Sequence, residues 1–543
     1  MATTTPLTIG DGSGWHFVNG AWTDGGDGAL KIPPDLADAE IAPLQGAHFA
    51  FDRTRALQDC RVSFDFLLRS HSDTGIILRA RDESHFYLVH FPNCGQASRA
   101  QHFWAALSKM GDAGYLELIR LQMLPRVPST NGIRMRCEIT LQGDRFTVRV
   151  GDYGRFEVRD GTYAGPGAVG AYLFGKAELG NVRVEGRSAP PVWRPGFEHP
   201  TNWWHPLPAG PGYWQQPTDI KRFDDGELLM LVNVQDDTSD ALTAHAQPFL
   251  TRSADDGRTW SELQPLGLGE LASSWSPARM HLTPRGRLIA MLPGTDHKLV
   301  YDSGDRGRTW SEAGTTNLHV GPPKDPPVQS LAPMGFLNLA DGGVLAFLLL
   351  GKDMHENPLP LHTWGSWHCQ AFCARSDDDG ATWSAPVNVD TPGFLDDGTP
   401  MEGNLDLTEC TATELGSGRI VAYMRPIYSP VMWESWSDDG GRTWGPAVRG
   451  PFAGYASPNM VRTASGALLI AHRMPGLTLH CSHDDGLTWD QGTMIDTGLW
   501  AMGSMVEVAP DEVLYVYWDT FKTLARAQRI RVTPSGLEPV RPT

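Results

Sequence analysis

The chain has 543 residues, which is too long for one hydrophobic core and predicts two or three domains. Its 63 acidic and 45 basic residues give a net charge of −18, which argues against nucleic acid or an anionic membrane surface as a partner. The 59 glycines, 41 prolines and 19 tryptophans indicate many turns and a β-rich fold.

The seven cysteines form neither a disulfide framework nor a C-x-x-C metal motif, so we expect reduced, mostly buried thiols and no metal or cofactor. The first residues lack the basic and apolar stretches of a signal peptide, and the longest aliphatic run, 344–350, is too short to cross a bilayer. These features predict a cytoplasmic protein, or a secreted one if a leader has been removed. The oligomeric state stays open.

Residues 1–188 alternate polar and apolar side chains with period two, as in 61–68, 85–91 and 145–150, which predicts an antiparallel β-sandwich. The order of the motif D-T-G-I-I-L-R-A at 73–80 and the late pair at 167–184 resembles a concanavalin-type, laminin-G-like jelly roll. The resemblance implies either a glycan-binding module or a packing module without a ligand. Residues 102–124 are richer in helix formers, and we expect them to lie over the neighbouring domain.

A proline-rich linker at 189–202 is followed by repeats in 203–543. The motif S-x-D-x-G-x-T-W occurs five times, beginning at Ser253, Ser303, Ser376, Ser437 and Ser482. Ser and Asp are expected to hydrogen-bond the turn backbone, Gly to adopt a positive φ, and Trp to pack into the sheet. The spacing of 45 to 73 residues between starts is typical of propeller blades.

These motifs resemble the Asp boxes of the sialidase-like, BNR-repeat superfamily, which implies four-stranded blades with the box between strands three and four. The first turn of each blade contains Gly226, Gly286, Gly342, Gly418 or Gly466, with a degenerate sixth turn at 511–512. We therefore predict an all-β protein, a six-bladed propeller preceded by a β-sandwich. The last strand should close the ring, aided by residues near Trp203 or by 529–532.

Because strand direction alternates, the start of strand one and the loop after strand two lie on the face opposite the boxes. Counting from the turn glycines places Glu409, Arg425 and Arg473 at that end of the central axis. One carboxylate and two guanidinium groups suit an acidic sugar, because arginine binds carboxylates bidentately, or the hydroxyls of a polar sugar ring. The alternative for all three is a buried ion pair that holds the ring together.

Residues 408–425 resemble the sialidase-family blade N-E-x-x-V-x-L-x-D-G-R…R, and 457–473 resemble the blade that follows it. The resemblance implies that Glu409 polarises a nucleophilic tyrosine and that Arg425 and Arg473 grip the substrate carboxylate. Two features depart from the family. The first arginine of the family's R-I-P motif is replaced by glutamine, and Gln216 is the expected substrate contact there. No tyrosine is present at 500–505.

The family's acid/base aspartate lies on the loop after strand two of blade one, here 235–245. Asp237 and Asp240 are the candidates for this role, with Asp237 favoured, and His245 is a candidate substrate contact. A glycosidase needs two carboxyl groups across the scissile bond, and because the tyrosine is absent we expect Glu409 and Asp237 to be that pair. The alternative is that these aspartates are solvated loop residues or turn caps.

A long loop at 351–368 of blade three should reach the same face. Trp364 is expected to stack on a sugar, and His362 and His368 to contact substrate or assist proton transfer. The alternative is a lid packed on its neighbour.

Together these features predict an exo-acting, sialidase-like glycoside hydrolase with a carbohydrate substrate, but not an orthodox sialidase. Whether that substrate carries an acidic sugar or a different one stays open. Two other functions stay open. One is a uronate-type polysaccharide lyase, whose product absorbs ultraviolet light, and the other is a non-catalytic glycan-binding protein.

Overall fold

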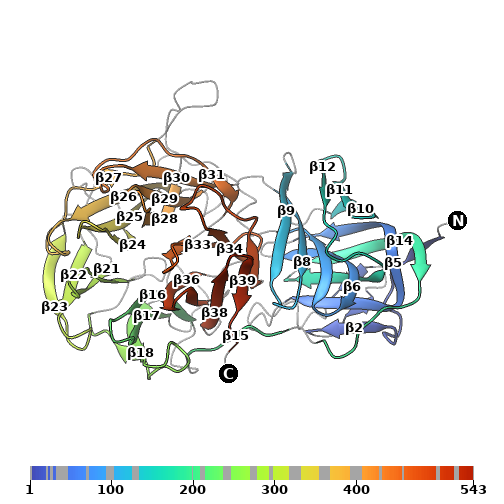
Figure 1. The fold of residues 1–543 in the computed structure, drawn as a ribbon, viewed down its shortest axis with the longest axis horizontal. Coiled ribbons are helices and arrows are strands. Elements are labelled where there is room, and N and C mark those ends of the chain that lie inside the picture. Colours follow the sequence, from blue (N-terminus) through green and yellow to red (C-terminus); the bar gives the residue numbers. More distant parts are fainter. Residues whose placement is uncertain are drawn as a thin grey trace.

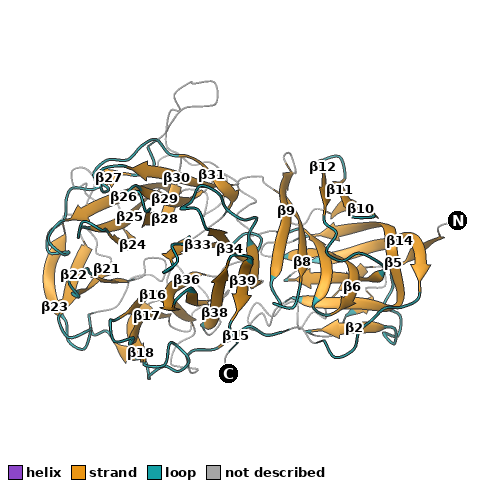
Figure 2. Ribbon diagram, in the orientation of Figure 1, coloured by secondary structure: helices purple, strands orange, loops and turns teal. Residues whose placement is uncertain are grey.

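The fold is all-β and contains a propeller (Figures 1 and 2). The computed structural model describes residues 3–19, 22–24, 29–31, 47–68, 72–92, 103–124, 134–175, 177–197, 200–207, 214–235, 246–268, 278–292, 298–316, 332–353, 367–391, 407–426, 431–454, 458–496, 502–518 and 525–541. Within these ranges no helix is long and apolar enough to span a membrane.

The propeller is built from successive antiparallel strands arranged around a central axis (Figure 1). In chain order they are β15 (Trp203–Trp204), β16 (Trp214–Arg222), β17 (Leu228–Gln235), β18 (Ala246–Ser253), β19 (Gln264–Pro265), β20 (Arg279–Leu282), β21 (Leu288–Leu292), β22 (Lys298–Ser303), β23 (Ser311–Thr316), β24 (Ala332–Asn338), β25 (Val344–Asp353), β26 (Trp367–Ser376), β27 (Val387–Asn388), β28 (Leu407–Glu414), β29 (Ile420–Pro426), β30 (Val431–Ser437), β31 (Val448–Ala453), β32 (Asn459–Arg462), β33 (Leu468–His472), β34 (Leu477–Ser482), β35 (Thr493–Asp496), β36 (Met502–Ala509), β37 (Glu512–Trp518), β38 (Arg526–Thr533) and β39 (Gly536–Pro539).

The described strands form five separate propeller sheets instead of the six that we predicted. Four sheets have four strands each, β16–β19, β20–β23, β24–β27 and β28–β31, and the fifth joins β15 and β36–β39. Strands β32–β35 also pair in sequence, but β35 continues into the N-terminal sheet by pairing with β9 (Leu116–Leu124). The difference arises because hydrogen bonding extends across the boundary between the two parts of the chain.

The repeated S-x-D-x-G-x-T-W turns follow the third strand of their units, as expected. In the first copy the Gly257 N–H donates to Ser253 Oγ over 2.9 Å, and the Thr259 hydroxyl donates to Asp255 Oδ2 over 2.6 Å. The other four copies repeat both bonds. The glycines of the five turns have φ between 80° and 84°. The turns are therefore structural and lie on the rim away from the site.

The ring closes through β15, as predicted for the region of Trp203. Trp203 pairs with Gln528 and Trp204 with Ala527 of β38. A strand that precedes the first blade thus joins the sheet made by the end of the chain and pairs with β38 at these two residues.

The N-terminal part of the chain is a second lobe beside the propeller (Figure 1). Its strands are β1 (Thr3–Pro6), β2 (Trp15–Val18), β3 (Thr23–Asp24), β4 (Ala29–Lys31), β5 (His48–Leu67), β6 (Asp73–Asp82), β7 (His85–His90), β8 (Phe103–Met110), β9 (Leu116–Leu124), β10 (Arg134–Gln142), β11 (Arg145–Val150), β12 (Gly154–Arg159), β13 (Gly167–Phe174) and β14 (Glu178–Ala189).

The long strand β5 joins two layers of this lobe. Its first half pairs with β2 and β13, which leads to β6, β7, β8 and β9. Its second half pairs with β10 and β14, which leads to β11 and β12 on one side. Apolar side chains of both layers, such as Leu78, Val89, Phe64 and Ile139, pack into one core. The alternation seen in the sequence reflects this burial of one face.

The prediction for residues 102–124 was right about location and wrong about structure. Strands β8 and β9 form there instead of a helix, because their pairing with β7 and β35 outweighs the local helix propensity. The contact with the propeller is extensive. Leu116 pairs with Met494 in the backbone, and the Tyr115 hydroxyl donates to Gln528 Oε1 over 2.9 Å.

Candidate active site

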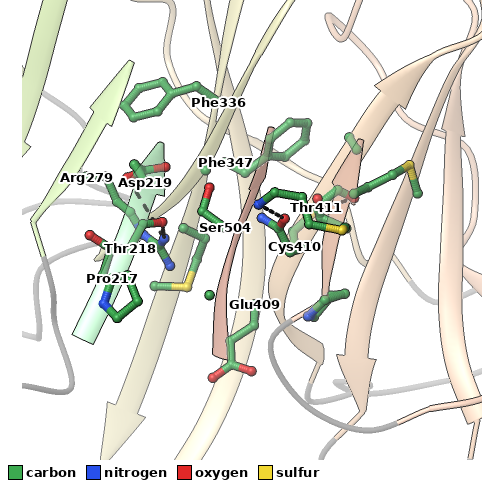
Figure 3. A pocket seen from close by; sticks show the side chains of 18 of the residues that line it. Pro217, Thr218, Asp219, Arg279, Phe336, Phe347, Glu409, Cys410, Thr411 and Ser504 are labelled. Atoms are coloured by element: carbon green, nitrogen blue, oxygen red, sulfur yellow. Dashed lines mark hydrogen bonds and ion pairs between the residues drawn. The ribbon is translucent and has the colours of Figure 1, made fainter. Parts of the chain in front are cut away.

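The central cavity of the propeller lies at the face opposite the repeated turns and has a volume of about 150 Å³. Residues from the innermost strands of the successive units line it, together with a few from the second strands (Figure 3). The polar and charged members are Gln216, Thr218, Asp219, Lys221, Arg279, Glu409, Thr411, Arg425, Asn459, Arg473 and Ser504.

Glu409 projects into this cavity from a β-bulge. Thr408 pairs with Arg425 and Cys410 with Met424, so Glu409 is the extra residue between them. Its φ is 41°, in the left-handed region, which costs a non-glycine residue about 1–2 kcal/mol. A bulge re-aims its side chain, here toward the axis.

Glu409 and Arg425 form an ion pair. Arg425 Nη1 donates to Glu409 Oε1 over 2.7 Å, and the side chains are 20% and 10% exposed. A charge-assisted contact in this partly desolvated position favours the carboxylate in its ionised form. Arg473 lines the same cavity and is only 1% exposed. The three residues singled out from the sequence therefore share one cavity, although the ion pair alone would also fit a structural role.

Gln216 also lines the cavity and is 8% exposed. The other predicted site residues lie outside the described residues: Asp237, Asp240, His245, His362 and Trp364. The backbone of His368 pairs with Lys352 between β25 and β26. Within the described part of the lining there is neither a tyrosine nor a histidine.

Three charged residues of the cavity were missed in the sequence, namely Asp219, Lys221 and Arg279. Asp219 Oδ2 accepts a hydrogen bond from the Met280 N–H over 2.9 Å, and Asp219 Oδ1 lies 3.6 Å from Lys221 Nζ. Arg279 Nη1 donates to the Thr218 carbonyl over 2.8 Å. The cluster therefore joins the first two sheets at the cavity wall.

A simple count from the turn glycines would have found Asp219 and Arg279. The residues seven places before the five turn glycines all line the cavity: Asp219, Arg279, Gly335, Thr411 and Asn459. Glu409 lies nine places before Gly418, and Arg425 and Arg473 lie seven places after Gly418 and Gly466. Those two offsets reach Glu409 but not the wall facing it.

The remaining lining is apolar, with Met334, Phe336 and Phe347 from β24 and β25. Phe336 stacks on His281 at 5.0 Å, and burial together with nearby Lys221 lowers the pKa of His281 to about 3. Burial also raises the pKa of the Cys410 thiol well above its usual value, which makes it a poor nucleophile.

Charge in the cavity opposes the charge of the whole chain. Its described lining carries four cations, Lys221, Arg279, Arg425 and Arg473, against the carboxylates of Asp219 and Glu409. The protein as a whole has a net charge of −18. A locally cationic cavity in an acidic protein attracts an anionic group. Among the described residues no cluster of His, Cys, Asp and Glu could hold a metal ion.

No family model matches the sequence, and no curated protein shows significant similarity to it. A protein of unknown function from Dyadobacter fermentans aligns with TM-score 0.48 and 13% identity over 61% of this chain and 100% of its own. The NanB sialidase from Streptococcus pneumoniae gives 0.47 and 11% over 88% and 95%, and the GH93 alpha-L-arabinofuranosidase of Fusarium graminearum gives 0.42 and 14% over 61% and 97%. At such values these likenesses transfer no activity to this chain.

Proposed function

We propose that the protein is an exo-acting glycoside hydrolase that removes an acidic sugar from the end of a glycan. The observation that carries this proposal is the ion pair of Glu409 and Arg425, which shares its cavity with the buried Arg473. A glycan is the expected ligand because the cavity combines anion-binding guanidinium groups with apolar walls at Phe336 and Phe347.

In this proposal Arg473 and Arg425 hold the carboxylate of the sugar. The contact with Glu409 uses one of the five N–H donors of Arg425, and a guanidinium can bind two partners through its planar fork. Because its arginine partner favours the ionised form, Glu409 suits the role of base, nucleophile or charge stabiliser. The complementary proton donor is then expected from Asp237 or Asp240.

The finer architecture belongs to the same proposal. We count β32–β35 as a blade, because these strands pair in the order seen in the other units. The propeller then has six blades and spans 203–543. The jelly-roll lobe at 1–188 and the linker at 189–202 complete the chain.

The test is turnover on a panel of oligosaccharides that end in different acidic sugars, with Glu409→Gln and Arg473→Lys compared with the wild-type protein. We expect Glu409→Gln to lower kcat/KM by about 10²-fold or more, and Arg473→Lys mainly to raise KM. Glu312→Gln, at an exposed position of β23, is the matched control and should behave like wild type.

Three outcomes would contradict the hydrolase. Full turnover by Glu409→Gln would show that Glu409 is not needed for the reaction. A product that absorbs in the ultraviolet would indicate a lyase. Binding of acidic glycans without turnover of any of them would indicate a glycan-binding protein.

A further inference from the structure

The cavity contains a second group of cations apart from Arg425 and Arg473. Lys221 and Arg279 lie on the wall formed by β16 and β20, and Figure 3 shows Arg279 beside Asp219 and away from Glu409. Nothing in the proposed removal of a sugar with one carboxylate requires this pair.

Asp219 does not balance both cations. It carries one negative charge, Lys221 Nζ is 3.6 Å from one of its oxygens, and Arg279 Nη1 is 4.0 Å from the other. The second oxygen also accepts the Met280 N–H. The cluster therefore keeps a net positive charge at the cavity wall, and a partly buried cation is stabilised by an anion placed beside it.

Arg279 also has donor capacity to spare. Its Nη1 donates to the Thr218 carbonyl, its side chain is 14% exposed, and a guanidinium carries five N–H donors. His281, next to this wall, adds no further positive charge, because it stays neutral at physiological pH. The hydrogen bond between Asp219 and Met280 is enough to join the first two sheets. Lys221 and Arg279 are therefore available for another role.

We propose that Lys221 and Arg279 bind a second anionic group of the substrate, a sulfate or phosphate ester on the same acidic sugar. A tetrahedral oxyanion can accept from an ammonium and a guanidinium together. The inference rests on the proposed function, because it places the ester on the sugar whose carboxylate meets Arg425 and Arg473. The substrate would then be an esterified acidic sugar.

Calorimetric titration tests the proposal with three probes: a uronic acid monosaccharide, its sulfate ester and its phosphate ester. In the wild-type protein we expect one ester to bind about tenfold more tightly than the plain acid. Lys221→Met should abolish this difference in affinity without weakening the binding of the plain acid, and Lys221→Arg should retain the difference. Lys109→Met in the N-terminal lobe is the matched control. The ester that gains affinity identifies the group.

Thermal unfolding with inorganic sulfate and phosphate separates this inference from the proposed function. One outcome is that these anions raise the Tm of the wild-type protein but not of Lys221→Met, while no acidic sugar is bound or turned over. This result would support the second anion site and overturn the hydrolase. Equal affinity for plain and esterified acids, or equal weakening of all probes by Lys221→Met, would overturn the second anion site alone. A Lys221→Met protein with a lowered Tm in the absence of any anion and unchanged ester preference would assign the residue to folding.

Discussion

Glu409 adopts a backbone conformation that opposes its residue type. Its φ of 41° is unfavourable for any side chain with a Cβ, yet a glutamate occupies the bulge and reaches Arg425. Strain of this kind persists where the surrounding structure enforces it, which is frequent at functional sites. The position therefore combines a local cost with a chemical use.

Comparing Glu409→Gly with Glu409→Ala isolates that strain, because both variants lose the carboxylate. In an ordinary strand glycine is about 0.5–1 kcal/mol less stable than alanine. Here we expect the order to reverse, with the glycine variant more stable by about 1 kcal/mol. Urea unfolding measures the difference, and a more stable alanine variant would show that the bulge is unstrained.

His281 should make the protein sensitive to acid. Its pKa is about 3 in the folded protein against an ordinary value of 6.5, because burial and Lys221 disfavour the charged ring. The unfolded chain therefore binds the additional proton as pH falls from 6.5 to 3. The free energy of unfolding should decrease over that window by about 1.4 kcal/mol per pH unit for this group.

His281→Gln should reduce that slope by the same amount while keeping a donor for Asn338, which His281 Nε2 contacts at 2.6 Å. Urea unfolding of both proteins between pH 4 and 7 checks this prediction. Parallel stability curves would mean that His281 is protonated in the folded state.

At the scale of the elements, the first repeated turn also closes a seam between sheets. A Cβ added to Gly257 of the first sheet would lie 2.3 Å from Leu514 of β37, whereas one added to Gly286 meets no atom within 4 Å. Both glycines have a positive φ, 82° and 79°. The two turns thus share the same backbone requirement and differ in packing.

Gly257→Ala should therefore be more destabilising than Gly286→Ala. We expect about 1–2 kcal/mol for the Gly286 variant, from backbone strain alone. The Gly257 variant should lose a further 1–3 kcal/mol or so, because Leu514 must move. Tm and urea unfolding of the pair would check this, and equal losses would mean that the seam is loosely packed.

The repeats were readable in the sequence because turn chemistry is local. Ser253, Asp255 and Gly257 need only one another to form their hydrogen bonds, so five copies identified the scaffold. Glu409 was found because counting along a strand preserves its place relative to the axis. Asp219 and Arg279, which were missed, follow the same rule at another place on the strand, seven residues before Gly226 and Gly286.

Other features depend on contacts between distant segments and could not be predicted. The pairing of Leu116 with Met494 joins strands that lie far apart in the sequence, and it turned an expected separate blade into part of a larger sheet. Residues 102–124 became strands for the same reason. The loop with Asp237 and Asp240 stays a prediction, since it lies outside the described residues.

For the whole molecule, the shared sheet predicts that the two lobes unfold together. Tyr115, Gln528, Tyr517 and Asp496 form a buried hydrogen-bonded chain between β38, β35 and the N-terminal lobe. We expect one cooperative transition in calorimetry. Tyr115→Phe should lower Tm and cost about 1–3 kcal/mol, because Gln528 Oε1 is left buried without its donor.

Two separate transitions, or a Tyr115→Phe effect confined to one of them, would contradict this coupling. Tyr153→Phe in the N-terminal lobe is the matched control, since its side chain packs against the core of that lobe.

Closing the ring through β15 has a consequence for biosynthesis. His205 contacts Ala525 across 320 residues of sequence. At roughly 5–20 residues per second, a ribosome needs roughly 16–64 s to make that stretch. Until translation is nearly finished, the backbone groups of β15 and β38 that pair with each other have no partner. Chaperones would be of most use in this period.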